Sequence, residues 1–273
     1  MRAMAVVWWA AAALAVPVVG SDVPQLLHQA EELAPHRYEP AVLRRMIDLY
    51  QEALAQRPED PQVLTGLAQL WYEWAVVEED VGEERAAFGR AAELSFRALG
   101  LSGLEAAEDM GGDEFACFLA SVQWGPPLLW AGDGWGQLLA TINPFKAFGV
   151  VPKLRAIYVR LIELDEDYFG AGGHRSLGAL VANLYGNAFA RVLFGADLDD
   201  AHHHLERAAS LAPGYLSNLV VYAQEYAVRA GDRALFQDLL TYVLAAPVGE
   251  WPFWNRLAKA DARQLLDRAE ELF

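Results

Sequence analysis

Cysteine and lysine are both scarce in this chain of 273 residues, which has a single cysteine and only three lysines among its 21 basic residues. One cysteine excludes an intramolecular disulfide. Cys117 has apolar neighbours in EFACFLAS, so we expect a small buried side chain rather than a reactive or metal-ligating thiol. The formal charge of −16 at pH 7 argues against nucleic acid and anionic membranes as partners, because both attract clustered Lys and Arg.

Motifs that carry catalysis are also lacking. The sequence has no G-x-S-x-G elbow, and its glycine-rich stretches GAGGH and GDGWG are not followed by the Lys-Ser or Lys-Thr pair of a phosphate loop. The three consecutive histidines 202–204 point in different directions on a helix, so at most one of them can pair with a residue three or four positions away. Such a pair gives only two ligands, which hold zinc poorly. We therefore expect a solvated histidine face, no metal, no cofactor and no enzyme activity.

Residues 1–20 have the layout of a secretory signal peptide. Arg2 precedes an apolar stretch, a proline then breaks the helix, and Gly20 is a small residue suited to cleavage. Cleavage after Gly20 leaves Ser21 as the new N-terminus and predicts an exported chain. An uncleaved anchor is the alternative, although the apolar run is shorter than the ~20 residues that span a bilayer comfortably.

Helix-forming segments recur with the spacing of tetratricopeptide (TPR) hairpins. Residues 199–215 contain the pattern A-x3-L-x2-A-x4-P, in which small residues let a neighbouring helix approach and proline ends the helix. The same phase recurs between Met46 and Pro58. Patterns typical of the preceding helix, with a bulky residue, a leucine and a small residue in order, begin at Leu64 and His174.

These repeats are degenerate. Insertions near 76–86 and 184–198 make these repeats longer than the ~34 residues of a regular repeat, and no run of alternating β-branched residues is long enough to predict a strand. We expect an all-α fold in which degenerate TPR-like hairpins form a single compact α-solenoid domain over residues 21–273.

The segment VQWGPPLLWAGDGWG contains three tryptophans among four glycines and two prolines. Indole rings offer wide apolar walls and glycines let backbones approach closely, so Trp124, Trp130 and Trp135 are candidates to line a ligand hollow. The alternative is that they are core residues of a kinked helix. Gly173 and His174 join the candidates because they begin a helix whose free amides can meet a polar head group. Packing between helices is the other role for His174.

Four stretches follow one another in a distinctive order: LTGLAQLWYEWA (64–75), LLWAGDGWGQLL (128–139), LIELDEDYFGAGGHRSLGAL (161–180) and LVVYAQEYAVRAGDRALFQDLLTYVLAAP (219–247). Together they resemble the T component of tripartite ATP-independent periplasmic (TRAP) transporters, the TatT family, over most of the mature chain. The resemblance implies a periplasmic TPR-like protein that associates with the transporter's substrate-binding protein. It also implies a homo-oligomer, a trimer, with an apolar hollow for a hydrophobic small molecule. Members often carry a lipid-modified cysteine at the mature N-terminus, which is absent here.

Two functions follow from these observations. The first is a transport accessory that docks a periplasmic substrate-binding protein and holds a hydrophobic solute. The alternative is a general periplasmic or secreted TPR scaffold that binds proteins and no solute.

Overall fold

The computed structural model describes residues 22–139 and 144–273, so the expected signal peptide, residues 1–20, lies outside the described residues. Within these ranges the chain is helical and has no strand, which confirms the all-α prediction. The elements are α1 (Val23–Leu33), η1 (Ala34–His36), α2 (Pro40–Gln56), α3 (Pro61–Val77), α4 (Val81–Ala98), α5 (Leu104–Asp109), α6 (Gly112–Ser121), α7 (Pro126–Leu138), α8 (Pro144–Leu164), α9 (Tyr168–Gly186), α10 (Ala188–Phe194), α11 (Leu198–Leu211), α12 (Ser217–Val221), the π-helical η3 (Tyr222–Ala227), α13 (Val228–Ala230), α14 (Arg233–Ala245), α15 (Pro252–Asp267) and α16 (Ala269–Leu272).

Helix starts follow local chemistry. Asp60 and Asp80 cap α3 and α4 by accepting hydrogen bonds from backbone amides of the first turn, which satisfies donors that the helix itself leaves free. Proline stands in the first turn of α1, α2, α3, α7 and α15, where its missing N–H costs no hydrogen bond. The acidic residues Glu78, Glu79 and Asp80 before α4 thus end in the residue that caps this helix.

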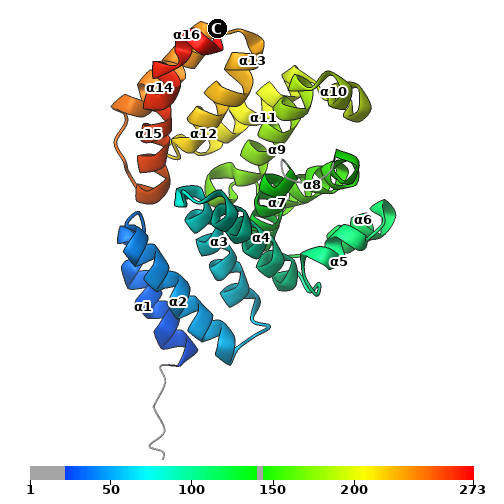
Figure 1. Ribbon diagram of the computed structural model, residues 1–273, viewed down its shortest axis with the longest axis vertical. Helices are drawn as coiled ribbons and strands as arrows, with labels where there is room; N and C mark the ends of the chain where they lie inside the picture. The colour runs from blue at the N-terminus through cyan, green and yellow to red at the C-terminus, as the bar shows by residue number, and fades with distance from the viewer. Residues whose placement is uncertain (1–21, 140–143) are drawn as a thin grey trace, which may run out of the picture.

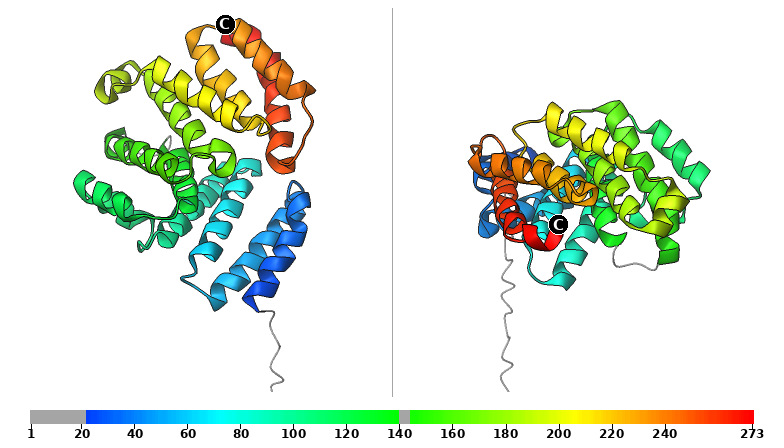
Figure 2. Two further views of the ribbon diagram at one scale, coloured as in Figure 1. Left: turned by 180° about the vertical axis from the view of Figure 1, so that it is seen from behind. Right: turned by 90° about the horizontal axis from the view of Figure 1, so that it is seen from above.

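The helices pack as antiparallel neighbours along a curved path (Figure 1). The path runs from α1 and α2 through α3 and α4 to α7, α8 and α9, and then by α11 to α14 and α15. In both views of Figure 2 the C-terminal helices return toward the N-terminal ones. At this closure the Arg256 guanidinium of α15 lies 4.2 Å from the centre of the Tyr38 ring.

Small residues at the predicted repeat phase form the contacts between helices. Ala53, Ala201 and Ala208 are completely buried, as is Leu205. In α9, the absence of a side chain at Gly178 admits Leu205 of α11, since a Cβ there would lie 2.7 Å from the Leu205 Cγ. The repeat spacing in the sequence therefore identified true helix–helix contacts.

Helix α8 begins at Pro144 and continues through Pro152; burial of Val151 and Leu154 on either side outweighs the hydrogen bond that an internal proline removes. The connections after α4 and α9 contain short helices, α5 and α10. One expectation about a single residue, the buried position of Cys117, is wrong. Cys117 is exposed, because α6 buries only Phe115 and Leu119.

The glycines of AGDGWG let α7 lie at the centre of the fold. A Cβ on Gly134 would lie 2.9 Å from the backbone N of Ala92 and from the backbone O of Phe88, both in α4. On another side of α7, a Cβ on Gly132 would lie 2.6 Å from the Tyr158 ring of α8. Alternating glycines therefore admit a helix backbone on one side and a tyrosine on another.

We predict that Gly134→Ala destabilises the protein by about 1–3 kcal/mol, because the added methyl group meets backbone atoms that cannot rotate away. Gly89→Ala is the matched control, since Gly89 lies inside α4 and a methyl group added there would have nothing within 4 Å of it. That control should gain about 0.5–1 kcal/mol from helix propensity. Thermal unfolding followed by circular dichroism measures both, and equal shifts of the two melting temperatures would contradict the packing described.

Candidate functional site

Two adjoining hollows lie where α3, α7, α9 and α12 meet. The larger has a volume of about 520 Å³ and reaches Tyr158 of α8 and Glu225 of η3. The smaller has a volume of about 220 Å³ and reaches Trp254 of α15. Tyr72, Asp133, Arg175 and Val221 line both hollows. These shared residues make the two hollows one continuous candidate site.

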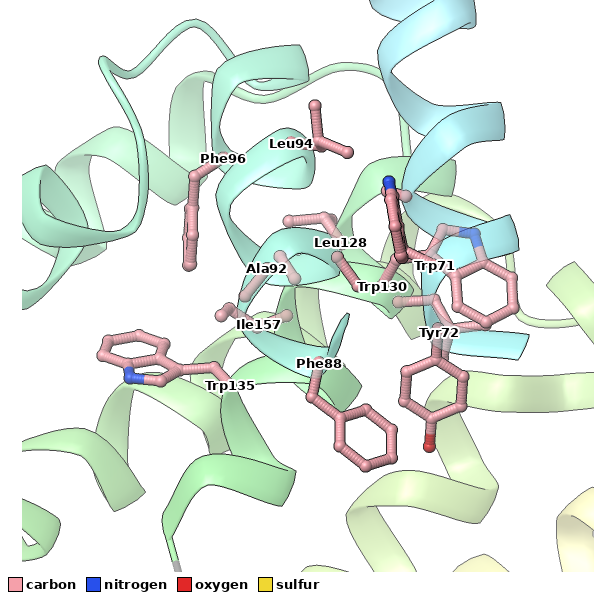
Figure 3. Packing of buried hydrophobic residues seen from close by; sticks show 14 of the residues in the cluster. Trp71, Tyr72, Phe88, Ala92, Leu94, Phe96, Leu128, Trp130, Trp135 and Ile157 are labelled. Carbon is pink, nitrogen blue, oxygen red and sulfur yellow. The ribbon is translucent and has the colours of Figure 1, made fainter. Parts of the chain in front are cut away.

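Aromatic rings form much of the wall. Tyr72 and Trp130 lie with their ring centres 5.5 Å apart, and Tyr215 and Trp254 complete the smaller hollow. Figure 3 shows Tyr72 and Trp130 together on one side of the core cluster. Burial raises the pKa of Tyr72 and of Tyr158, so both phenols stay neutral. The walls are thus apolar surfaces with a few neutral hydroxyl groups, as is usual for small-molecule pockets.

A carboxylate and a guanidinium lie at the junction of the two hollows. Burial raises the pKa of Asp133, and the nearby Arg175 charge and hydrogen bonds from Ser176 and Tyr158 oppose that rise. Arg175 is only 9% exposed. Charges are rare at such depth because their removal from water is costly unless a partner compensates.

Arg175 also holds an unusual backbone turn at the start of α9. Phe169, Gly170 and Ala171 all have left-handed backbone angles, with φ of 51°, 65° and 57°. This conformation costs roughly 1–2 kcal/mol for each residue with a side chain. The Arg175 Nη1 donates to the carbonyl oxygens of Phe169 and Gly170 at 3.4 and 3.5 Å.

Asn218 of α12 completes this support. Its Nδ2 donates to the carbonyl oxygens of Gly170 and Ala208, each at 2.9 Å, and its Oδ1 accepts from the Arg175 Nη1 at 3.2 Å. Asn218 is almost completely buried, so these bonds form away from water, where an unmade one would be costly. The network ties α9, α11 and α12 together beside the site.

Comparison with known protein families gives the identity. A family model described as the TRAP transporter T-component matches residues 40–273. The chain belongs to this family. Among the residues that the structure describes, none of the helices has the length and apolarity needed to cross a membrane.

A search of the curated proteins found no match. Among solved structures, the chain is similar to a thermophilic TPR protein from Thermus thermophilus, with a TM-score of 0.57 and 14% sequence identity. The match covers 89% of this chain and 100% of that one. At this identity the similarity shows the fold alone: the T component is a TPR-like helical protein.

The structure places the five candidate residues of this T component in different surroundings. Trp130 is buried and lines the smaller hollow. Trp135 is equally buried but packs against Phe96, with ring centres 5.5 Å apart, on the far side of the cluster in Figure 3. Trp124 is 40% exposed and borders neither hollow.

The remaining two candidates lie next to the site but not in it. Gly173 packs against α8, where a Cβ would lie 2.8 Å from the Ile162 Cγ1. His174 is 5% exposed and faces His204 of α11. Of the five candidates, Trp130 alone lines the shared hollows.

Asp133 and Arg175 were missed because each stands beside a residue that drew attention for another reason. Asp133 lies inside AGDGWG, and Arg175 follows directly after GAGGH. The available signal was a charged residue within each glycine-rich, otherwise apolar stretch. A charge in such surroundings is either paired or functional.

The histidines of α11 are not a solvated face, contrary to expectation; His203 alone of the three is exposed. His202 stacks on Tyr226 and lies 2.7 Å from the Tyr222 hydroxyl. The Nδ1 atoms of His204 and His174 are 2.8 Å apart. The helix turns these rings toward α9 and η3, which supply the partners. In the described part of the chain, no group of three or more His, Cys, Asp or Glu side chains is arranged to hold a metal.

The His174–His204 contact is sensitive to protons. Since one ring must donate and the other accept, both facing nitrogens cannot carry a proton. Burial, followed by the charge of His174, lowers the pKa of His204 to about 4. Glu166 lies 3.1 Å from the His174 Nε2 and also pairs with Arg207, while Asp200 lies 3.7 Å from the His204 Nε2.

We predict that this contact makes the folded state less stable in mild acid. An unfolded His204 takes up its proton near pH 6.5, whereas the folded one does so only near pH 4. Between these values the unfolded state binds more protons, so stability is complete above pH 6.5 and falls as the pH decreases. The loss from pH 7.5 to pH 5 is about 2 kcal/mol for this group.

Urea unfolding at the two pH values measures the effect. His204→Gln removes the titrating group and should reduce the loss, whereas His28→Gln, at an exposed histidine of α1, should keep it. Equal losses in wild type and both variants would show that the pair does not govern acid sensitivity.

Proposed function

We propose that this chain is the periplasmic T component of a TRAP transport system that docks a substrate-binding protein and holds a hydrophobic solute in the two adjoining hollows. The observation that carries the solute part is the aromatic lining of the two adjoining hollows. Tyr72, Trp130, Tyr215 and Trp254 line the smaller one, of about 220 Å³, and Tyr72 and Tyr158 line the larger one, of about 520 Å³. Together these spaces suit a small molecule. Family membership supports the transport part.

The acidic chain fits this role. A net charge of −16 keeps the protein from binding polyanions, and the helical solenoid presents extended surfaces typical of proteins that hold other proteins. The export signal expected in residues 1–20 supports a periplasmic location for the mature chain, where it would meet a substrate-binding protein. A homo-oligomer, a trimer, belongs to the same proposal.

We predict that a simple apolar solute changes tryptophan fluorescence through Trp130 and not through Trp135. Both tryptophans are buried in α7, but Trp130 lines the smaller hollow and Trp135 packs against Phe96. Titration with 1-octanol should give a saturable change in wild type that persists in Trp135→Phe and is strongly reduced in Trp130→Phe. If wild type and both variants respond alike, or if none responds, the hollows hold no solute and the scaffold function replaces this part of the proposal.

The docking part predicts a stable complex. The mature chain, mixed with the substrate-binding protein of the same transport system, should elute from size-exclusion chromatography with a mass equal to the sum of both proteins, measured by light scattering. The mass of the chain alone gives its oligomeric state in the same run. Absence of a complex at ~100 μM of each protein, where contacts of micromolar affinity are mostly occupied, would remove docking from the proposal.

A further inference from the structure

Asp133 and Arg175 border both hollows, yet no ion pair within 4.0 Å joins them among the ion pairs of the described residues. The two charges sense each other, because the Arg175 charge lowers the pKa of Asp133 against the effect of burial. They are therefore neighbours that both border the hollows without forming an ion pair in the described part of the chain. This arrangement leaves each charge without a direct ionic partner.

The described direct contacts of Arg175 are all with neutral groups. Its Nη1 atom donates to two backbone carbonyls and to the Asn218 amide oxygen, at 3.2–3.5 Å. Its guanidinium carbon lies 4.9 Å from the centre of the Tyr215 ring. All of these partners are neutral, so an anionic group in the hollow would be the first direct countercharge for Arg175.

The groups around Asp133 supply no positive charge at contact distance either. Ser176 and Tyr158 hydrogen-bond to it, and both are neutral. A cationic group in the hollow would meet this carboxylate beside aromatic rings, which themselves attract cations. Asp133 thus suits a cationic group, just as Arg175 suits an anionic one.

The other charged residues of the hollows do not disturb this balance. Glu225, in the larger hollow, pairs with Arg229 at 2.9 Å and accepts a hydrogen bond from Asn183. Asp261, in the smaller hollow, is an exposed residue at the rim. At the junction itself there remain one positive and one negative side chain.

We propose that the solute is a zwitterionic amphiphile, whose head places an anionic group against Arg175 and a cationic group against Asp133 while its apolar part lies along Trp130 and Tyr72. This inference rests on the proposed solute-holding function and specifies its ligand class. A purely anionic head would approach Arg175 but also face Asp133 with like charge. A purely cationic head would meet the same conflict at Arg175.

Four probes with eight-carbon skeletons separate the contributions: 1-octanol, octanoate, octylamine and the zwitterion 2-aminooctanoate. Isothermal titration calorimetry of the mature chain at pH 7.5 gives a dissociation constant for each. We expect 2-aminooctanoate to bind at least about tenfold more tightly than octanoate or octylamine, because a hydrogen-bonded charge pair contributes at least one power of ten in affinity.

Asp133→Asn tests the assignment of the two ends. The change keeps shape and removes one charge, so the junction becomes positive and octanoate should bind as tightly as 2-aminooctanoate, with octylamine weakest. Asp238→Asn is the matched control, because Asp238 is an exposed residue of α14 outside both hollows; it should keep the wild-type order. Circular dichroism confirms that each variant is folded.

The outcomes are distinguishable. If all four probes bind equally to wild type, or if octanoate or octylamine equals the zwitterion, the head-group inference is overturned while solute holding survives. An unchanged order of affinities in Asp133→Asn also overturns it. If no probe binds to wild type, the hollows hold no such solute and the solute part of the proposed function fails as well.

Discussion

The left-handed turn at Phe169, Gly170 and Ala171 is the constraint on which the site depends. Phe169 and Ala171, the two residues of the turn that have side chains, together cost about 2–4 kcal/mol in this conformation, and the hydrogen bonds from Arg175 and Asn218 to the turn carbonyls offset that cost. The turn directs the Phe169 ring against Trp130, with ring centres 4.7 Å apart. It therefore positions both the aromatic wall and the buried guanidinium.

Asn218 extends this constraint beyond one helix. By donating to the Ala208 carbonyl at the end of α11 and to the Gly170 carbonyl, it fixes the angle at which the C-terminal helices leave the central ones. Asn255 of α15 joins the next segments in the same way. Its Nδ2 donates to the carbonyl oxygens of Gly214 and Val248, and its Oδ1 accepts from the Leu216 amide. Two buried amides with all these bonds made thus connect the repeat-like hairpins to the helices that close the smaller hollow.

Much of the fold could be predicted from sequence, because helix pairing follows local spacing. Ala201, Leu205 and Ala208 lie at the predicted contacts. The features that could not be predicted depend on tertiary packing. A proline inside α8 and an exposed thiol in α6 are decided by which face each helix buries, and a degenerate repeat does not reveal that face.

The site was harder to predict because its parts come from helices distant in the chain. Trp130 was found as a tryptophan among glycines, but the same reasoning selected Trp124 and Trp135, which point elsewhere. Sequence spacing does not tell which side of α7 faces the hollows. In the folded protein that side is set by Gly134, which packs against α4, and by Gly132, which packs against Tyr158.

Arg175 thereby has two roles that constrain each other. Its Nη1 holds the strained turn, so the guanidinium cannot swing away to form an ion pair with Asp133 without releasing the carbonyls of Phe169 and Gly170. Because the turn needs these hydrogen bonds, Arg175 stays apart from Asp133. The junction of the hollows therefore has charged groups at its centre and aromatic rings at its walls. Arg175 therefore has a structural reason for its burial, because the turn needs its hydrogen bonds. Among the residues that the structure describes, Asp133 has no ion-pair partner at the junction, and a carboxylate withdrawn from water without one is costly, which is why its position beside the hollows points to a ligand.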